Sequence, residues 1–256
     1  MLFARKEVNL VNGFQMLDTR EMFLVHETEE IENIVASILT PEIWSKWTDA
    51  SAKDVPPPDF YCDELNLMME VMRVDDHGFK KKGNIINPTY DREHQVEKQL
   101  REAGIFDMFP NANLFITANT GLPTEQDHNY TYYLENFKRT IGNHVIKIPK
   151  YRENHPNYKL IFFVYDESSA YFEDACTISP NGIIASGKPH MFMLDESFTQ
   201  AFKNSDIDYF IWFAPYKRFE HIESSFELPK ACIYKVGEAL PVEYKYNSFK
   251  MRSIEK

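Results

Sequence analysis

The sequence has few of the residues that mark several common protein classes. Three of its 256 residues are cysteines, widely separated and in no Cys-x-x-Cys arrangement. This argues against a disulfide framework or a structural zinc site, and it indicates a reducing compartment. Glycine is also scarce, with nine residues, and there is no Gly-x-Gly-x-x-Gly, P-loop or Gly-x-Ser-x-Gly motif. Nucleotide-cofactor, NTPase and α/β-hydrolase functions therefore lack support.

Long apolar runs are missing as well. No segment approaches the length of about 20 apolar residues that a membrane-spanning helix needs. The basic residues Arg5 and Lys6 are followed by further charge and not by the apolar core of a signal peptide. We therefore expect a cytoplasmic protein with no membrane partner.

Basic residues are outnumbered by acidic ones, 28 to 39, which gives a net charge of −11. A local basic patch would still allow nucleic-acid binding, but the overall field opposes it. The hydrophobic fraction of 43% is ordinary for a globular protein. With no internal repeat or low-complexity linker, we predict a single domain over residues 1–256, with a core at about 27–213 and a C-terminal extension of short strands at 214–256.

Hydrophobic periodicity divides the chain into alternating helices and strands. Helical spacing is found at 27–39, 91–103, 128–148 and 196–203. Continuous apolar runs, typical of strands covered on both faces, are found at 113–118, 159–166 and 208–213. Residues 1–25 alternate in short pieces, which predicts one or two strands. The pattern predicts an α/β fold in which helices flank a central mixed β-sheet.

An acidic β-hairpin is the most informative local feature. Two strand-like runs, 59–62 and 66–75, are joined by a tight turn, and if that turn centres on Glu64 and Leu65, Asp59 lies directly opposite Glu70. Directly opposed side chains have Cβ atoms about 4.5–5.5 Å apart. Two carboxylates at that distance repel each other unless one is protonated or a cation lies between them. Mg²⁺ and similar hard ions prefer such oxygen ligands.

The hairpin resembles the PD-(D/E)XK nuclease superfamily in its Pro58-Asp59 pair, followed on the next strand by Glu70-x-Met72. The order of elements is also similar: an acidic leading helix, the acidic hairpin, strand 113–118, a long helix and strand 159–166. The resemblance covers about residues 27–213. It implies a restriction-endonuclease-like fold and phosphodiester hydrolysis with Mg²⁺ or Mn²⁺. It also implies metal binding by Asp59 and Glu70, with Glu30 as a third carboxylate for which Glu27 and Glu29 are alternatives.

The chain departs from this family at the catalytic lysine. The family places it two residues after the second acid, where this sequence has Met72, a side chain that cannot stabilise developing charge. Arg73 is adjacent, but the strand period of two points it to the opposite face. A basic group from a neighbouring element would have to replace the lysine. The candidates are Lys138, Lys147 and the run Lys80-Lys81-Lys82.

Other uses of these residues stay open. Asp59 and Glu70 would also suit a solvated face with no metal. Asp75-Asp76-His77 supplies either a further ligand or general base, or only a polar strand end. The expected function is a metal-dependent nuclease, and the alternative is a catalytically inactive nuclease-like scaffold that acts as a binding or interaction protein. Met72 and the net charge favour that alternative.

Overall fold

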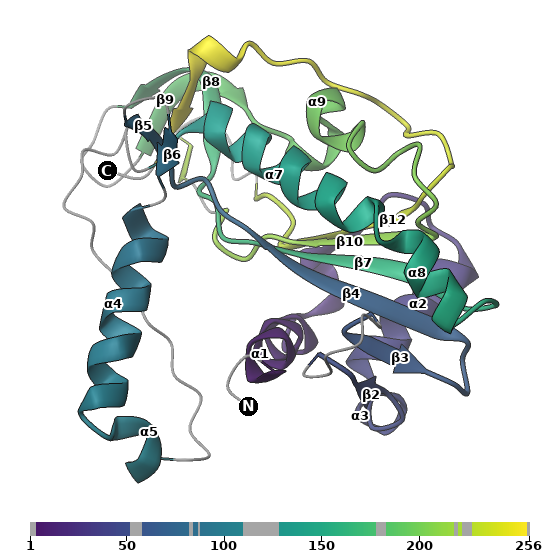
Figure 1. Cartoon of the computed structure of the whole chain (residues 1–256). Coiled ribbons are helices and arrows are strands. Elements are labelled where there is room, and N and C mark those ends of the chain that lie inside the picture. Colours follow the sequence, from purple (N-terminus) through teal and green to yellow (C-terminus); the bar gives the residue numbers. More distant parts are fainter. Residues whose placement is uncertain are drawn as a thin grey trace.

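A computed structural model (Figure 1) describes residues 4–51, 58–81, 84–86, 88–109, 128–177, 183–217, 220–221 and 227–254. The chain forms a single mixed α/β domain, as the periodicity predicts. The predicted strand 113–118 lies outside the described residues. Among the helices that the structure describes, none combines the length and the apolar character needed to cross a lipid bilayer.

The central sheet has seven strands in the order β1-β12-β10-β7-β4-β3-β2. Their bounds are β1 (Met22–Leu24), β2 (Thr48–Asp49), β3 (Phe60–Cys62), β4 (Leu67–Val74), β7 (Lys159–Asp166), β10 (Tyr209–Phe213) and β12 (Ala231–Lys235). Strands β4, β7 and β10 run parallel, whereas β3 runs antiparallel to β4. The carboxyl ends of the three parallel strands therefore meet at one edge, where α/β proteins often place polar sites.

Helices cover both faces of this sheet (Figure 1). One face packs against α7 (Tyr130–Val145), α8 (Ile148–Asn154) and α9 (Glu196–Thr199), and the other against α1 (Ala4–Gln15), α2 (Glu29–Leu39) and α3 (Pro41–Trp44). Alternate residues of β4 enter the two cores: Met68 and Met72 face α7, while Met69 and Val71 face α1 and α2. Glu70 shares the parity of Met68 and Met72, so it faces α7 and α8.

The remaining elements lie around this core. A second sheet has the order β11-β9-β8-β13, a third is the hairpin β5-β6, and α4 and α5 extend away from the central sheet (Figure 1). Their bounds are β5 (Phe79–Lys81), β6 (Asn84–Ile86), α4 (Pro88–Glu102), α5 (Ile105–Met108), β8 (Tyr171–Thr177), β9 (Ile183–Pro189), β11 (Glu220–His221) and β13 (Met251–Ser253), with 3₁₀ turns η1 (Thr19–Glu21), η2 (Phe192–Leu194) and η3 (Ser248–Lys250).

The prediction of strands at the N-terminus is wrong for its first half. Residues 4–15 form helix α1, and only Met22–Leu24 form a strand. Val11 and Phe14 are fully buried, and the Phe14 ring lies 5.4 Å from that of Phe163. Val8 and Leu10, which suggested alternation, are also three and four residues from Val11 and Phe14 along the helix. This short apolar pattern is therefore compatible with both the strand period of two and the helical period of 3.6. Packing against the sheet favours the helix.

The C-terminal segment 214–256, expected to be an extension of the core, contributes a strand to the central sheet. Strand β12 lies within the sheet, antiparallel to β10 and parallel to β1. Residues on both sides of the expected core, 27–213, thus complete one sheet. The predicted long helix at 128–148 is α7, followed by a break and by α8, which has Pro149 in its first turn.

Candidate metal centre at the edge of the central sheet

The hairpin has the register that the sequence predicts. Phe60 pairs with Met69 and Cys62 with Leu67, so continuing the ladder by one position puts Asp59 opposite Glu70. Residues 63–66 form the turn, which Asn66 closes with a left-handed backbone at φ 51°. Asparagine is one of the few residues that tolerates this conformation. The local sequence therefore fixes which two carboxylates meet.

Asp59 is the residue immediately before β3, and both its side chain and its carbonyl form hydrogen bonds with neighbouring segments. Its Oδ2 accepts a hydrogen bond from the Val71 amide at 2.8 Å, and its carbonyl accepts one from Ala50 at 2.7 Å. Burial and the adjacent Glu70 carboxylate raise the pKa of Asp59 to about 8, against the weaker lowering effect of the Val71 hydrogen bond. In the metal-free protein the pair therefore holds a proton near neutral pH.

Glu70 lies under the corner between α7 and α8 and is 5% exposed. Its Oε1 is 2.6 Å from Nδ1 of His144 on α7. The Tyr151 hydroxyl on α8 also donates to Glu70, and burial followed by the Glu70 charge raises the pKa of that phenol. His144 continues the sheet-facing stripe of α7, because it follows the buried Ile141 by three residues. Neither partner can be recognised from the sequence, since His144 and Tyr151 form no motif with Glu70.

Of the two lysines proposed for this site, Lys147 is the better placed. It is the N-cap residue of α8, midway between His144 and Tyr151 along the chain, and its positive charge lowers the pKa of Asp59. Lys138 is exposed on α7. It lies six residues before His144, about 9 Å along the helix axis and rotated by about 240°. Of the two lysines, Lys147 is therefore the one whose charge acts on Asp59, and Lys138 lies on a different face of α7.

Glu30 is engaged elsewhere. Its carboxylate forms ion pairs with Lys159 and Lys235, the latter at 2.7 Å, and accepts a hydrogen bond from Tyr209. These three residues belong to β7, β12 and β10, and their contacts, led by the hydrogen bond from Lys159, lower the pKa of Glu30 to about 2. Glu30 therefore balances two lysines at the amino ends of β7 and β10, whereas Asp59 lies at the start of β3, opposite Glu70 of β4.

Met72, at the position of the family's catalytic lysine, and the adjacent Arg73 both make structural contacts. Met72 is 3% exposed in the core under α7. The Arg73 guanidinium forms ion pairs with Glu167 and with Glu93 of α4, the latter at 3.3 Å. Lys80 and Lys81 lie on β5, and Lys82 lies outside the described residues. Neither Met72 nor Arg73 contributes a free cation to Glu70.

A second polar region lies at the carboxyl ends of the parallel strands. Asp166 is fully buried and accepts hydrogen bonds from Tyr133 at 2.5 Å and Trp212 at 2.8 Å. The Lys217 ammonium lies 3.5 Å from Asp166 and donates to Ser168. Asp166, Ser168 and Lys217 are each at most 4% exposed, so this group is a closed internal network. Lys217 belongs to no sequence motif that would indicate this network.

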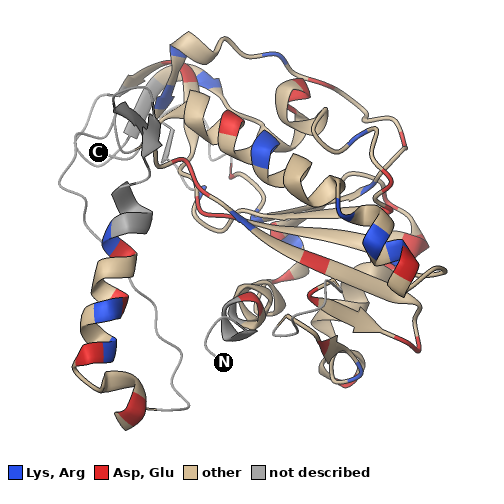
Figure 2. Cartoon of the chain, viewed as in Figure 1, with Lys and Arg blue, Asp and Glu red and all other residues tan. Residues whose placement is uncertain are grey.

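Basic residues alternate with acidic ones along several of the described helices. Figure 2 shows acidic and basic positions interspersed along α4 and along α7 and α8. Arg152 pairs with Asp208 at 2.8 Å, and Lys159 pairs with Glu30.

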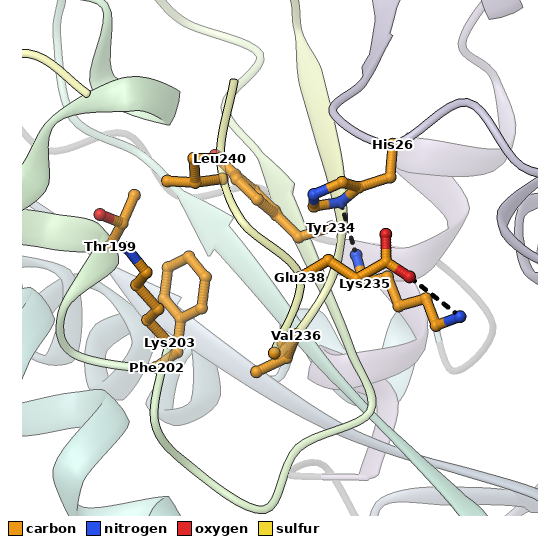
Figure 3. A pocket seen from close by; sticks show the side chains of 10 residues that line it. His26, Thr199, Phe202, Lys203, Tyr234, Lys235, Val236, Glu238 and Leu240 are labelled. Atoms are coloured by element: carbon orange, nitrogen blue, oxygen red, sulfur yellow. Dashed lines mark hydrogen bonds and ion pairs between the residues drawn. The ribbon is translucent and has the colours of Figure 1, made fainter. Parts of the chain in front are cut away.

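A hollow between β12 and α9, lined by His26, Phe202 and Tyr234 among others, has space for about one water molecule (Figure 3). Its Lys235–Glu238 ion pair is 3.1 Å long and lies at the rim.

Comparison of the chain with protein-family models, with curated proteins and with solved structures found no match. The nuclease resemblance therefore depends on the hairpin motif and on the order of the elements.

Proposed function

We propose that this protein is a divalent-metal-dependent phosphodiesterase of the nuclease type, with Asp59 and Glu70 as the metal ligands. The observation that carries the proposal is the opposed carboxylate pair, in which burial and Glu70 raise the pKa of Asp59 to about 8. Two carboxylates this close are stabilised either by a shared proton or by a cation, and Mg²⁺ or Mn²⁺ would replace the shared proton. The order α2, β3–β4 hairpin, α7 and β7 supports the restriction-endonuclease-like arrangement that the motif suggests, in which strand 113–118, outside the described residues, would stand between the hairpin and α7.

The residues at the corner of α7 and α8 have distinct tasks in this proposal. His144 and Tyr151 orient Glu70, as residues behind a metal ligand commonly do. Lys147 supplies the positive charge that Met72 cannot, close to the phosphate of the bound strand. The bound metal ion would lower the pKa of its water and stabilise negative charge on the phosphate.

Cleavage of labelled oligonucleotides tests this function. With Mg²⁺ or Mn²⁺ we expect cleavage by the wild type, and a loss of at least about 100-fold in Glu70→Gln and Asp59→Asn, because either change removes a ligand. Lys147→Ala should reduce the rate, and the matched variant Lys138→Ala should not. An unchanged rate in Glu70→Gln, or no cleavage of single- or double-stranded DNA or RNA with either ion, would rule the function out.

One observation favours a second function, that of a catalytically inactive scaffold for binding other molecules. Glu70 is 5% exposed beneath His144 and Tyr151, and Met72 is 3% exposed in the core. A site closed in this way would keep its carboxyl pair as a buried, proton-sharing contact. Mg²⁺ and Mn²⁺ would then leave the melting temperature of the wild type unchanged, whereas a resident ion would raise it and Asp59→Ala would abolish the rise.

A further inference from the structure

A cluster of one aspartate and two histidines lies beyond the carboxyl end of β4, separate from the Asp59–Glu70 pair. Donor atoms of Asp76, His77 and His128 all lie within 4.8 Å of one another. Nδ1 of His128 is 3.0 Å from Oδ1 of Asp76, and the two imidazole rings have centroids 4.8 Å apart. Within the part of the chain that the structure describes, no other group of three histidine, cysteine or acidic side chains is as close.

Asp76 is fixed in position by its other carboxylate oxygen. The side chain is 0% exposed, and Oδ2 accepts hydrogen bonds from the Ser169 amide at 3.1 Å, the Ser169 hydroxyl at 2.9 Å and the Tyr171 hydroxyl at 2.7 Å. Oδ1 is thereby directed at His128. Carboxylates that bind metal ions are commonly held in this way by hydrogen bonds to one of their oxygens.

The two histidines are held by backbone contacts between their neighbours. The Asn129 amide donates to the Asp76 carbonyl at 3.1 Å, and this bond joins the segment after β4 to the start of α7. The Asn129 side chain also caps α7 by accepting from Thr131 and Tyr132. Asn136 donates to the carbonyl and carboxylate of Asp75, each at 3.1 Å. His77 and His128 are thus brought together by a folded framework and are only partly buried, so an ion can enter.

We propose that Asp76, His77 and His128 bind a divalent transition-metal ion of the Zn²⁺ class. Two imidazoles and one carboxylate suit Zn²⁺ and its neighbours in the first transition row, whereas Mg²⁺ and Ca²⁺ prefer oxygen ligands alone. Ligand atoms around a tetrahedral zinc ion lie about 3.3 Å apart, given metal–ligand distances of about 2.0–2.1 Å. The 3.0 Å separation of Asp76 and His128 is close to this value. Three protein ligands leave one position for water, and the bound ion joins the end of β4 to the start of α7.

Titration of the metal-free protein with ZnCl₂ tests this site. We expect one tight site per chain in the wild type, at least about tenfold weaker binding in His77→Gln and in His128→Gln, and no change in His155→Gln. His155 is the matched control, because it packs against Tyr61 and Tyr158 outside the cluster. Excess Mg²⁺ should not displace the zinc. Asp76 itself is left intact, since its buried hydrogen bonds also support the fold.

The absorption spectrum of the Co²⁺-substituted protein identifies the ligand atoms. Nitrogen and oxygen ligation gives visible bands without strong thiolate charge transfer, whereas an ion on the exposed Cys176 would show that transfer. Unchanged zinc affinity in both histidine variants, thiolate bands, or no tight binding by the wild type would each overturn the proposal. Matching circular dichroism spectra of the metal-free variants establish that a lost site is not a lost fold.

Discussion

Asp59 lies beside the middle of strand β4, opposite Glu70, whereas Asp76 lies two residues beyond the carboxyl end of that strand. Their surroundings move their pKa values in opposite directions. The pKa of Asp59 is raised to about 8, and that of Asp76 is lowered to about 2. Asp76 is nevertheless the more deeply buried, with no exposed surface, while Asp59 is only half-buried. Burial alone therefore does not decide which carboxylate stays ionised.

The number of donors and the sign of the neighbouring charge make the difference. Burial is the largest single influence on Asp76 and raises its pKa, but the combined effects of His128, His77 and Tyr171 outweigh it. Asp59 has one backbone donor, from Val71, and a carboxylate neighbour. His128 and His77 therefore keep Asp76 ionised, whereas a proton is shared between Asp59 and Glu70. Metal binding at the Asp59–Glu70 pair would displace that proton.

The largest effect that separates the two aspartates is on stability. Asp76→Ala leaves the Ser169 and Tyr171 hydroxyls and the His128 imidazole without their acceptor, and we expect a loss of about 3–5 kcal/mol in the free energy of unfolding. Asp59→Ala removes one hydrogen bond and one repulsion, so its loss should stay below about 1 kcal/mol. Urea denaturation of both variants with a chelator present measures the two values. Equal losses would contradict the comparison.

Mn²⁺ and Zn²⁺ should distinguish the Asp59–Glu70 site from the Asp76 cluster. At about 100 times its dissociation constant, an ion stabilises the protein by about 2.7 kcal/mol. We expect Mn²⁺ stabilisation to disappear in Asp59→Asn and persist in His128→Gln, and Zn²⁺ stabilisation to show the reverse. Thermal unfolding of the wild type and the two variants with each ion provides the readout. If one variant abolished both effects, the two clusters would be a single site.

The pH dependence of stability should differ between the two aspartates in metal-free protein. Asp76 has a folded pKa below its unfolded value of 3.8, so its contribution is present above pH 4 and is lost as the pH falls toward 2. Asp59 has a folded pKa above 3.8, so its contribution is present below pH 4 and is lost as the pH rises toward 8.

Asp59→Asn isolates the second of these effects. Between pH 4 and pH 8 the wild type should lose about 1–3 kcal/mol relative to Asp59→Asn, since the asparagine does not titrate and solvent screens part of the effect at this half-buried side chain. Denaturation midpoints at a series of pH values test the difference. Parallel pH profiles for the two proteins would show that Asp59 ionises at its ordinary pKa.

The sequence was sufficient for the hairpin and insufficient for its surroundings. The turn at residues 63–66 and the period of two fixed the pairing of Asp59 with Glu70, and the apolar run at 159–166 marked β7 with its observed bounds. These features depend on neighbours along the chain. His144 and Tyr151 meet Glu70 from 74 positions away and more, through a helix corner whose placement only tertiary packing determines.

Glu30 and the Asp76 cluster are two further cases in which contacts between distant segments cannot be predicted from the sequence. Nothing in the acidic segment 27–32 indicates that Glu30 forms ion pairs with Lys159 and Lys235. Likewise, Asp75-Asp76-His77 suggests a polar strand end until the fold brings His128 beside it. Charge pairs between distant segments leave no periodicity in a sequence, so a ligand set assembled in this way is visible only in three dimensions.

The smallest expected effect separates Lys147 from Lys138. An exposed charge contributes about 0.2–1 kcal/mol, and one pH unit corresponds to about 1.36 kcal/mol. Lys147→Ala should therefore raise the pKa of Asp59 by about 0.2–0.7 of a pH unit, because the lysine charge favours the carboxylate. Lys138→Ala should leave that pKa unchanged. NMR titration of the Asp59 carboxyl carbon at low salt measures both, and equal shifts would mean that the corner of α7 and α8 does not direct Lys147 at the pair.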